Sequence, residues 1–162
     1  MEKLNDRIRS CQKCPLWIGA KNAVPGEGPS NAIVMLIGQN RGEEEDRTGR
    51  PFVGRSGKFL NAVLSKSEID RSALFITSVV KHKSPANRKP KPDEIAACVP
   101  YLGCQINLIK PEIIVLMGAV AWQVPRREGI TYIVTYHPSA AMRFTKVRKK
   151  FEDDFRALKQ LL

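Results

Sequence analysis

The chain has few of the features that mark secreted or membrane proteins. Its first residues, MEKLNDRIRSCQKC, contain no apolar segment, so we expect no signal peptide. The longest apolar runs, residues 32–37 and 113–122, are shorter than the roughly 20 residues that span a bilayer. Cysteine is scarce, with four in 162 residues, and no two are placed like an obvious disulfide pair. We therefore expect an intracellular protein with no membrane partner, in a compartment that keeps thiols reduced.

Acidic residues are also in short supply. There are 16 Asp and Glu against 27 Lys and Arg, which gives a net charge of +11. This excess favours a polyanionic partner, most simply nucleic acid, although a generally basic solvated surface has the same composition. The length predicts a single domain over residues 1–162, with enough buried surface to fold without a metal.

The hydrophobic pattern predicts a parallel α/β fold. Four short runs are nearly continuously apolar, as in strands covered on both faces: residues 32–37, 74–80, 112–117 and 131–136. Helical patterns occupy residues 56–64, residues 93–109 with Asp93 as the expected N-cap, and an amphipathic segment over 144–161. This alternation of strands and helices predicts a parallel sheet with helices on both faces.

Polar residues directly follow three of the predicted strands. They are Gly38, Gln39 and Asn40 after the first, Lys81, His82 and Lys83 after the second, and His137 after the fourth. Ligands of open α/β sheets bind outside the carboxyl ends of the strands. These residues therefore predict a binding site at one edge of the sheet.

Three features at that edge suit a nucleobase. The carboxamides of Gln39 and Asn40 can bind a base edge or orient a water, although Asn beside Gly also fits an ordinary turn. Phe52, in the glycine-rich segment GRPFVGRSG, offers a ring for stacking or a plug for the core. His137 can donate to an oxygen that gains negative charge, or can simply be a surface histidine.

The cysteine spacing indicates a metal site. Cys11 and Cys14 form a C-x-x-C pair, which directs two thiols toward one point, although two buried free thiols are the alternative. Cys98 and Cys104 lie far downstream and could complete a four-ligand site by folding back.

Together these segments resemble the iron–sulfur uracil-DNA glycosylases of family 4. The resemblance runs over nearly the whole chain and rests on CQKCPL at 11–16, VPGEGP at 24–29, EDRTGRPFVGRSG at 45–57, VVKHKSP at 79–85 and HPSAAM at 137–142. It implies a three-layer α/β/α sandwich around a central four-stranded parallel sheet. It also implies a monomeric enzyme that flips uracil out of single- or double-stranded DNA and hydrolyses the N-glycosidic bond, leaving an abasic site.

The resemblance implies a role for several residues. Phe52 would stack on the base, His137 would donate to uracil O2 as the base leaves, and Gly38, Gln39 and Ser78 would line the base site. The chain departs from the family where Gln39 replaces Glu, Asn40 and Arg41 replace Ala and Pro, Ser78 replaces Asn, and His82 replaces Cys.

The glycine turn is closer to other branches of the superfamily, which carry Asp or Asn at the position of Asn40. We therefore predict that Asn40 orients the attacking water, in an enzyme slowed because an amide is a weaker base than a carboxylate. Ser78 has fewer groups than Asn for reading a base edge, so the substrate range is expected to change. Two alternatives remain: a glycosylase for another deaminated base, and a DNA-binding iron–sulfur module without excision activity.

The resemblance also implies a structural 4Fe-4S cluster. Its expected ligands are Cys11, Cys14, Cys98 and His82, which stands in the slot of the family's remaining cysteine. Cys104 is the alternative fourth ligand, and zinc is the alternative metal. The cluster would hold the basic loop 81–92 against DNA. Contacts with DNA are expected from Lys81 and Lys83 of that loop, and also from Arg143.

Overall fold

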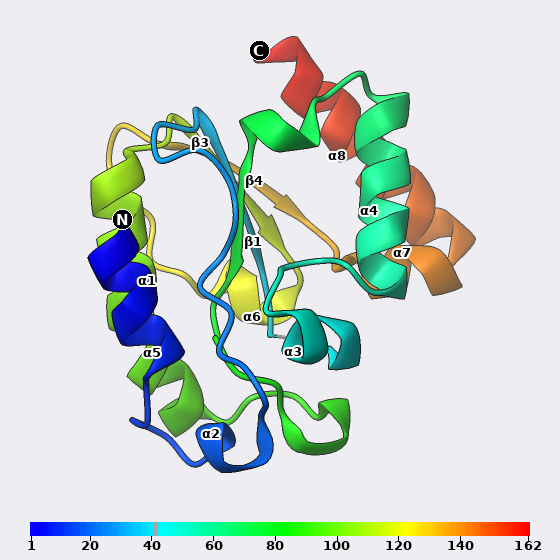
Figure 1. The fold of residues 1–162 in the computed structure, drawn as a ribbon. Coiled ribbons are helices and arrows are strands. Elements are labelled where there is room, and N and C mark those ends of the chain that lie inside the picture. The colour runs from blue at the N-terminus through cyan, green and yellow to red at the C-terminus, as the bar shows by residue number, and fades with distance from the viewer. Residues whose placement is uncertain (41) are drawn as a thin grey trace.

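The computed structural model describes residues 1–40 and 42–162, so Arg41 of the glycine turn lies outside the described residues. Four parallel strands form one sheet in the order β2-β1-β3-β4 (Figure 1). The strands are β1 (Val34–Gly38), β2 (Phe75–Ser78), β3 (Ile113–Met117) and β4 (Thr131–Thr135). The predicted parallel α/β architecture is confirmed.

Helices cover both faces of this sheet. The α-helices are α1 (Glu2–Arg9), α2 (Leu16–Gly19), α3 (Glu43–Thr48), α4 (Arg55–Lys66), α5 (Pro92–Ile109), α6 (Ala119–Trp122), α7 (Pro138–Arg143) and α8 (Thr145–Gln160). Two short 3-10 helices are η1 (Arg71–Ala73) and η2 (Pro85–Asn87). In Figure 1, α1 and α5 lie on one side of the sheet and α4, α7 and α8 lie on the other, which gives three layers. Within the described residues, no helix is long and apolar enough to span a membrane.

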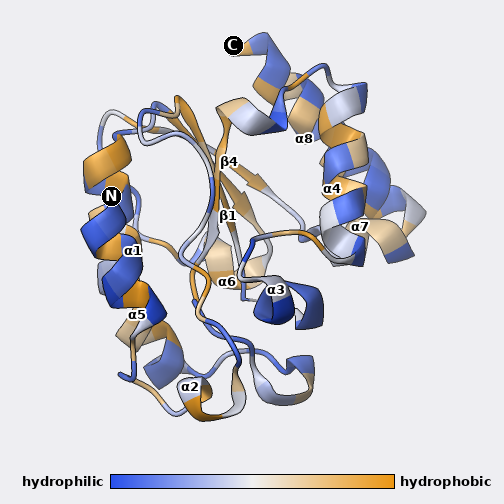
Figure 2. Cartoon of the chain, viewed as in Figure 1, coloured by the Kyte–Doolittle hydropathy of each residue, from blue (hydrophilic) through white to orange (hydrophobic). Residues whose placement is uncertain are grey.

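Alternate residues of the strands build two separate cores. From β1, Met35 and Ile37 pack toward the α5 side, together with Leu102 and Ile106 of that helix. The opposite face carries Leu36, which packs with apolar residues of α4 and α8, including Leu60, Phe151 and Phe155. Strands buried on both faces are nearly continuously apolar, as Figure 2 shows for the centre of the molecule.

Two local predictions were wrong. The run at 131–136 was expected to be covered on both faces, but β4 is an edge strand in which Thr131 and Val134 are exposed. The helix α5 begins at Pro92 rather than after Asp93, because its N-cap is Lys91. The carboxylate of Glu94, in the first turn of the helix, accepts a hydrogen bond from the Lys91 backbone N–H at 2.8 Å. Glu94 rather than Asp93 therefore caps the start of α5.

Candidate active site and cysteine cluster

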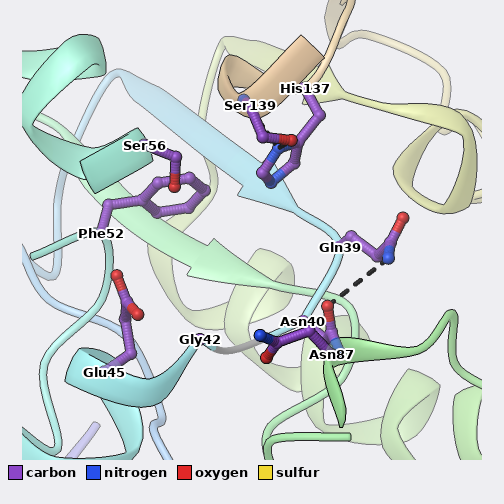
Figure 3. A pocket seen from close by; sticks show the side chains of 9 residues that line it. All are labelled: Gln39, Asn40, Gly42, Glu45, Phe52, Ser56, Asn87, His137 and Ser139. Carbon is purple, nitrogen blue, oxygen red and sulfur yellow. Dashed lines mark hydrogen bonds between the residues drawn. The ribbon is translucent and has the colours of Figure 1, made fainter. Parts of the chain in front are cut away.

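A cavity of about 320 Å³ opens at the carboxyl edge of the sheet (Figure 3). It lies where β1 and β4 end and where α3, α4 and α7 begin. Its walls are formed by Gln39, Asn40, Gly42, Glu45, Phe52, Ser56, Asn87, His137 and Ser139. Four of the predicted site residues therefore meet from segments far apart in the sequence: Gln39, Asn40, Phe52 and His137.

Phe52 is held in a backbone conformation that few side chains adopt. Its φ is +49°, and its side chain is 4% exposed. The ring lies against Gly38, where a Cβ would come within 2.5 Å of Phe52 Cζ. A Cβ on Gly57 would come within 2.0 Å of the Phe52 carbonyl oxygen. The two glycines thus provide the room that lets the ring form a wall of the cavity.

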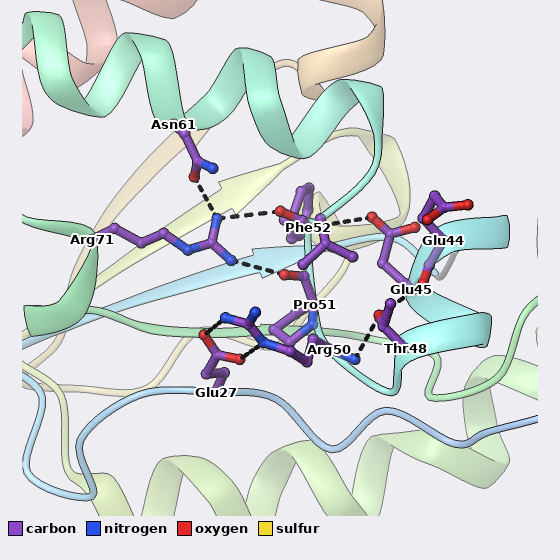
Figure 4. Close-up of polar contacts among 10 residues, drawn as sticks. Glu27, Glu44, Glu45, Thr48, Arg50, Pro51, Phe52, Asn61 and Arg71 are labelled. Carbon is purple, nitrogen blue, oxygen red and sulfur yellow. Dashed lines mark hydrogen bonds and ion pairs between the residues drawn. The ribbon is translucent and has the colours of Figure 1, made fainter.

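A carboxylate and a guanidinium fix the Phe52 loop from opposite sides (Figure 4). Glu45 Oε1 accepts hydrogen bonds from the backbone N–H groups of Val53 and Gly54, both at 2.9 Å. Arg71 donates to the carbonyl oxygens of Pro51 at 2.8 Å and Phe52 at 3.3 Å. A buried carboxylate such as that of Glu45 needs such partners, and the two side chains together hold the strained loop in place. Sequence reasoning missed this role of Glu45, although its place just before the glycine-rich segment was a signal.

Replacement of Gly57 by alanine tests this packing. Gly57 lies in the first turn of α4, where alanine normally stabilises a helix by about 1 kcal/mol relative to glycine. Here we expect destabilisation by about 1–3 kcal/mol, because the new methyl group collides with the Phe52 carbonyl. Thermal unfolding measures the effect, and Gly19→Ala is the control because nothing lies within 4 Å of a Cβ there. Equal stability of the two variants would contradict the packing argument.

The imidazole of His137 has a defined tautomer. Its Nδ1 accepts a hydrogen bond from the Ser139 backbone N–H at 3.1 Å and lies 2.7 Å from the Ser139 hydroxyl. A neutral ring therefore carries its proton on Nε2. Burial lowers the pKa of His137 from 6.5 to about 4, against the opposing charge of Glu45. At neutral pH the site therefore presents a neutral N–H donor. The centres of the His137 and Phe52 rings are 6.1 Å apart.

The depressed pKa predicts how His137 responds to pH. Between pH 6.5 and about 4 the unfolded chain takes up a proton here that the folded chain does not. The contribution of His137 to the free energy of unfolding is therefore complete above pH 6.5 and is lost as the pH falls toward 4. NMR titration of the His137 ring should give a midpoint near pH 4, with His82→Gln used to assign the signals. A midpoint at or above 6.5 would contradict the account.

Asn40 is oriented by a buried hydroxyl. Its Nδ2 donates to Ser84 Oγ at 2.8 Å, and Ser84 is fully buried. This leaves Asn40 Oδ1 on the cavity side, 3.5 Å from Gln39 Nε2 (Figure 3). The Gln39 backbone carbonyl accepts from Val80 N–H at 3.0 Å, which extends the pairing of β1 with β2 and fixes the turn. Asn40 can therefore accept a hydrogen bond from a water in the cavity.

Comparison with known proteins adds the chemistry to this geometry. The family model of the uracil DNA glycosylase superfamily matches residues 25–161. A type-4 uracil-DNA glycosylase of Sulfurisphaera tokodaii is 39% identical over 99% of this chain and 84% of its own length. Those of Saccharolobus solfataricus and Pyrobaculum aerophilum are 40% and 39% identical, over 100% and 95% of this chain and 86% and 90% of their own lengths. The chain belongs to the type-4 uracil-DNA glycosylases.

Among the predicted site residues of this glycosylase, Ser78 and Lys81 are buried outside the cavity. Ser78 is fully buried, and its hydroxyl donates to the Val80 carbonyl at 2.7 Å, so it does not line the base site. Lys81 is fully buried as well and cannot reach a DNA phosphate. Its ammonium donates to Thr77 Oγ1, the Ser78 carbonyl and Gln105 Oε1 at 2.7–2.9 Å. Both side chains turn into the protein in this structure.

The other two predicted DNA contacts lie near the surface. Lys83, from the loop after β2, forms an ion pair with Glu43 of α3, which lowers the pKa of Glu43 through their hydrogen bond. Arg143 is exposed and lines a second groove beside the cavity, together with Arg55 and Met142. Sequence reasoning missed Asn87, which adds a carboxamide to the cavity, and Ser139, which orients His137. Asn87 lies in the basic loop after β2 and Ser139 in the HPSA segment, and the sequence analysis had singled out both segments.

Three of the four cysteines share a buried region near the start of α5. Cys11, Cys14 and Cys98 are 8%, 7% and 1% exposed, and burial raises the pKa of the Cys14 and Cys98 thiols. The Cys14 thiol interacts with the backbone N–H of Leu16, and the Cys98 thiol with that of Lys81. Cys11 and Cys14 both lie close enough to raise the pKa of Cys98. This proximity and the N–H donors suit thiolates that hold a cluster.

The fourth ligand position is less complete. The His82 imidazole is buried, and its Nδ1 has no hydrogen-bond partner among the described residues. Burial lowers the pKa of His82, and the charge of Asp46 opposes this shift. Cys104 is half-buried and packs against the apolar residues under α1. In the described part of the chain, no three His, Cys, Asp or Glu side chains form a group that could hold a single metal ion.

Proposed function

We propose that this chain removes uracil from DNA by hydrolysing its N-glycosidic bond, the activity for which its relatives are named. The observation that supports it most is His137, a neutral imidazole with Nε2–H as its donor beside a buried aromatic ring in a cavity of about 320 Å³. A cavity of this size accommodates a single nucleobase but not a DNA duplex. The base must therefore leave the duplex stack before it enters, at a cost of a few kcal/mol.

In the proposed reaction the flipped uracil stacks on Phe52. His137 Nε2–H donates to uracil O2, where negative charge grows as the bond between C1′ and N1 breaks and its electron pair passes to the base. Asn40 Oδ1 accepts a hydrogen bond from the water that adds to C1′. The water supplies the hydroxyl of the abasic sugar, and its proton neutralises the uracil anion. No covalent intermediate with the protein is required.

Glu45 is proposed to act as a positioning residue. Its Oε1 is occupied by two backbone N–H groups, so the carboxylate holds the Phe52 loop in place. Its negative charge also faces a cavity in which the sugar becomes positive as the bond breaks. That charge favours the transition state over the neutral substrate.

Asn87 is proposed to read the base edge that Ser78 cannot reach. Asn87 lies in η2 with φ +54°, a conformation that Asn tolerates, and its side chain lines the cavity opposite His137 (Figure 3). A carboxamide both donates and accepts, as the uracil edge requires. We also propose that the protein acts as a monomer, as its resemblance to the family implies.

An excision panel tests the proposed function. Oligonucleotides with a single uracil, hypoxanthine, xanthine or thymine, single-stranded and paired, are incubated with the purified protein and treated with alkali to cleave abasic sites. We expect cleavage at uracil in preference to the other bases. Preference for hypoxanthine or xanthine would assign another deaminated base. Binding of these DNAs without cleavage would instead assign a DNA-binding module.

We propose that a 4Fe-4S cluster is held by Cys11, Cys14, Cys98 and His82. Three buried, mutually close thiols fit this donor set. So does a buried imidazole nitrogen that has no hydrogen-bond partner in the described part of the chain, since histidine also ligates iron–sulfur clusters. When bound, the cluster would supply a covalent cross-link between the N-terminal segment, the loop after β2 and α5. We propose a structural role, which keeps Ser84 and Asn87 of that loop against the cavity.

Iron content distinguishes the ligands. We expect Cys98→Ser and His82→Ala to lower bound iron and sulfide in anaerobically purified protein, and Cys104→Ser to leave both unchanged. The 400 nm absorbance and the iron-to-protein ratio measure this without reference to activity. Loss of iron in Cys104→Ser together with full retention in His82→Ala would reverse the assignment of the fourth ligand. One zinc per protein molecule, with no iron, would show that the site holds zinc instead of a cluster.

A further inference from the structure

Two aromatic side chains outside the cavity form an exposed pair beside it. Trp122 and Tyr136 are 37% and 39% exposed, and their rings meet edge to face, with centroids 6.0 Å apart and an angle of 67° between the planes. Neither belongs to the hydrophobic cores on the two faces of the sheet. Large aromatic rings contribute most to stability when buried, so this exposure needs another explanation.

The pair has a fixed position at the edge of the sheet where the cavity opens. Trp122 ends α6, which follows β3 directly, and its indole N–H donates to the Thr135 carbonyl at 2.6 Å. Tyr136 is the residue before His137, whose Cβ lies 3.0 Å from the Cβ position of Gly118, just before α6. The indole therefore has its one donor satisfied, and 37% of the residue stays exposed.

A cation is fixed beside the pair. Arg126 donates to the carbonyl oxygens of Trp122 at 3.1 Å and Val124 at 2.7 Å, and its guanidinium lies 5.0 Å from the centre of the Tyr132 ring. Arg126 is exposed, so its charge faces solvent. Exposed aromatic rings next to a fixed positive charge are the features with which proteins bind single-stranded nucleic acid, through base stacking and phosphate attraction.

We infer that Trp122 and Tyr136 form a stacking platform for an unpaired nucleobase that neighbours the flipped base in single-stranded DNA. The inference rests on the proposed function, in which the cavity beside His137 takes one base from a strand. A neighbouring base of that strand is then brought to the residues adjoining His137. Paired bases are stacked within the duplex, so the platform favours single-stranded substrate.

Fluorescence tests the platform directly, because Trp17 and Trp122 are the chain's two tryptophans. In a Trp17→Phe background, emission from Trp122 is followed during titration with oligothymidylate that contains no uracil. We expect quenching on saturation. Binding to DNA without uracil requires no excision, so quenching is also expected of a protein that lacks excision activity. Absence of quenching would count against the platform and would not bear on the excision assay.

Affinity measurements complete the test. Tyr136→Ala and Trp122→Leu should each weaken binding of single-stranded oligothymidylate by about tenfold and leave duplex binding unchanged. Tyr136→Phe keeps the ring and should keep the affinity. Trp17→Ala is the matched control, since Trp17 is equally exposed, at 40%, but lies on α2. Circular dichroism and thermal unfolding establish that each variant is folded. Unchanged Trp122 emission together with wild-type affinity in both platform variants would overturn the inference.

Discussion

Replacing His137 with alanine is expected to slow uracil excision by about 10²- to 10³-fold, the usual cost of losing one donor to a developing oxyanion. The donor is a neutral Nε2–H, because Nδ1 accepts from Ser139 and burial lowers the pKa to about 4. A neutral donor costs no reorganisation as charge grows on the base. Single-turnover rates on a uracil oligonucleotide measure the loss, and the affinity for the same DNA should change much less.

Two further variants separate donation from charge and from packing. His137→Gln keeps an N–H donor of the side chain and should retain more activity than His137→Ala. Ser139→Ala removes the hydroxyl beside Nδ1 but keeps the backbone N–H, so it should lower the rate less than either. A rate for His137→Ala equal to that of the wild type would remove His137 from the mechanism.

Replacing Asn40 with alanine is expected to reduce the rate by about 10²-fold, at the lower end of the range for a positioned base. Asn40 Oδ1 is the cavity acceptor left over once Nδ2 has bonded Ser84, so its loss leaves the water unoriented. Rates are measured at saturating DNA, where a change reports on the chemical step. An unchanged rate would show that the water is held elsewhere.

Asn40→Asp provides the opposite test at the same position. A carboxylate is a stronger base than an amide, so this variant should be faster than the wild type if Asn40 acts on the water. Ser84 lies behind Asn40 and touches it through Nδ2, so Ser84→Ala should lower the rate of the wild type by misplacing the amide. A variant Asn40→Asp that is as slow as Asn40→Ala would indicate a purely structural role for the amide.

The sheet could be predicted from sequence because its strands are unusually uniform. β1, β2 and β3 are buried along their whole length, so each stands out as an apolar run. β4 was located correctly, but its exposed edge position was not, since an edge strand with Ile133 and Val134 has the same composition as a buried one. The cap of α5 was missed because Glu94 reaches back from inside the helix.

The position of a site residue could be predicted where that residue comes directly after a strand. Asn40 follows β1 and His137 follows β4, and they meet in the cavity because parallel strands end at one edge. Ser78 and Lys81 are at the same edge, yet they turn inward to bond Val80 and Gln105. Side-chain direction at a strand end depends on which buried carbonyls and amides need partners, and a single sequence does not specify those long-range contacts.

The most direct test of the proposed function is the amount of free uracil that purified protein releases from DNA. A single-stranded oligonucleotide with one uracil is incubated with the wild type and with the double variant Asn40→Ala, His137→Ala, and free base and abasic sites are both quantified. We predict equal amounts of uracil and abasic sites from the wild type, and release by the double variant slower by at least about 10²-fold. DNA that is bound by the wild type but yields no free uracil would contradict the proposed function.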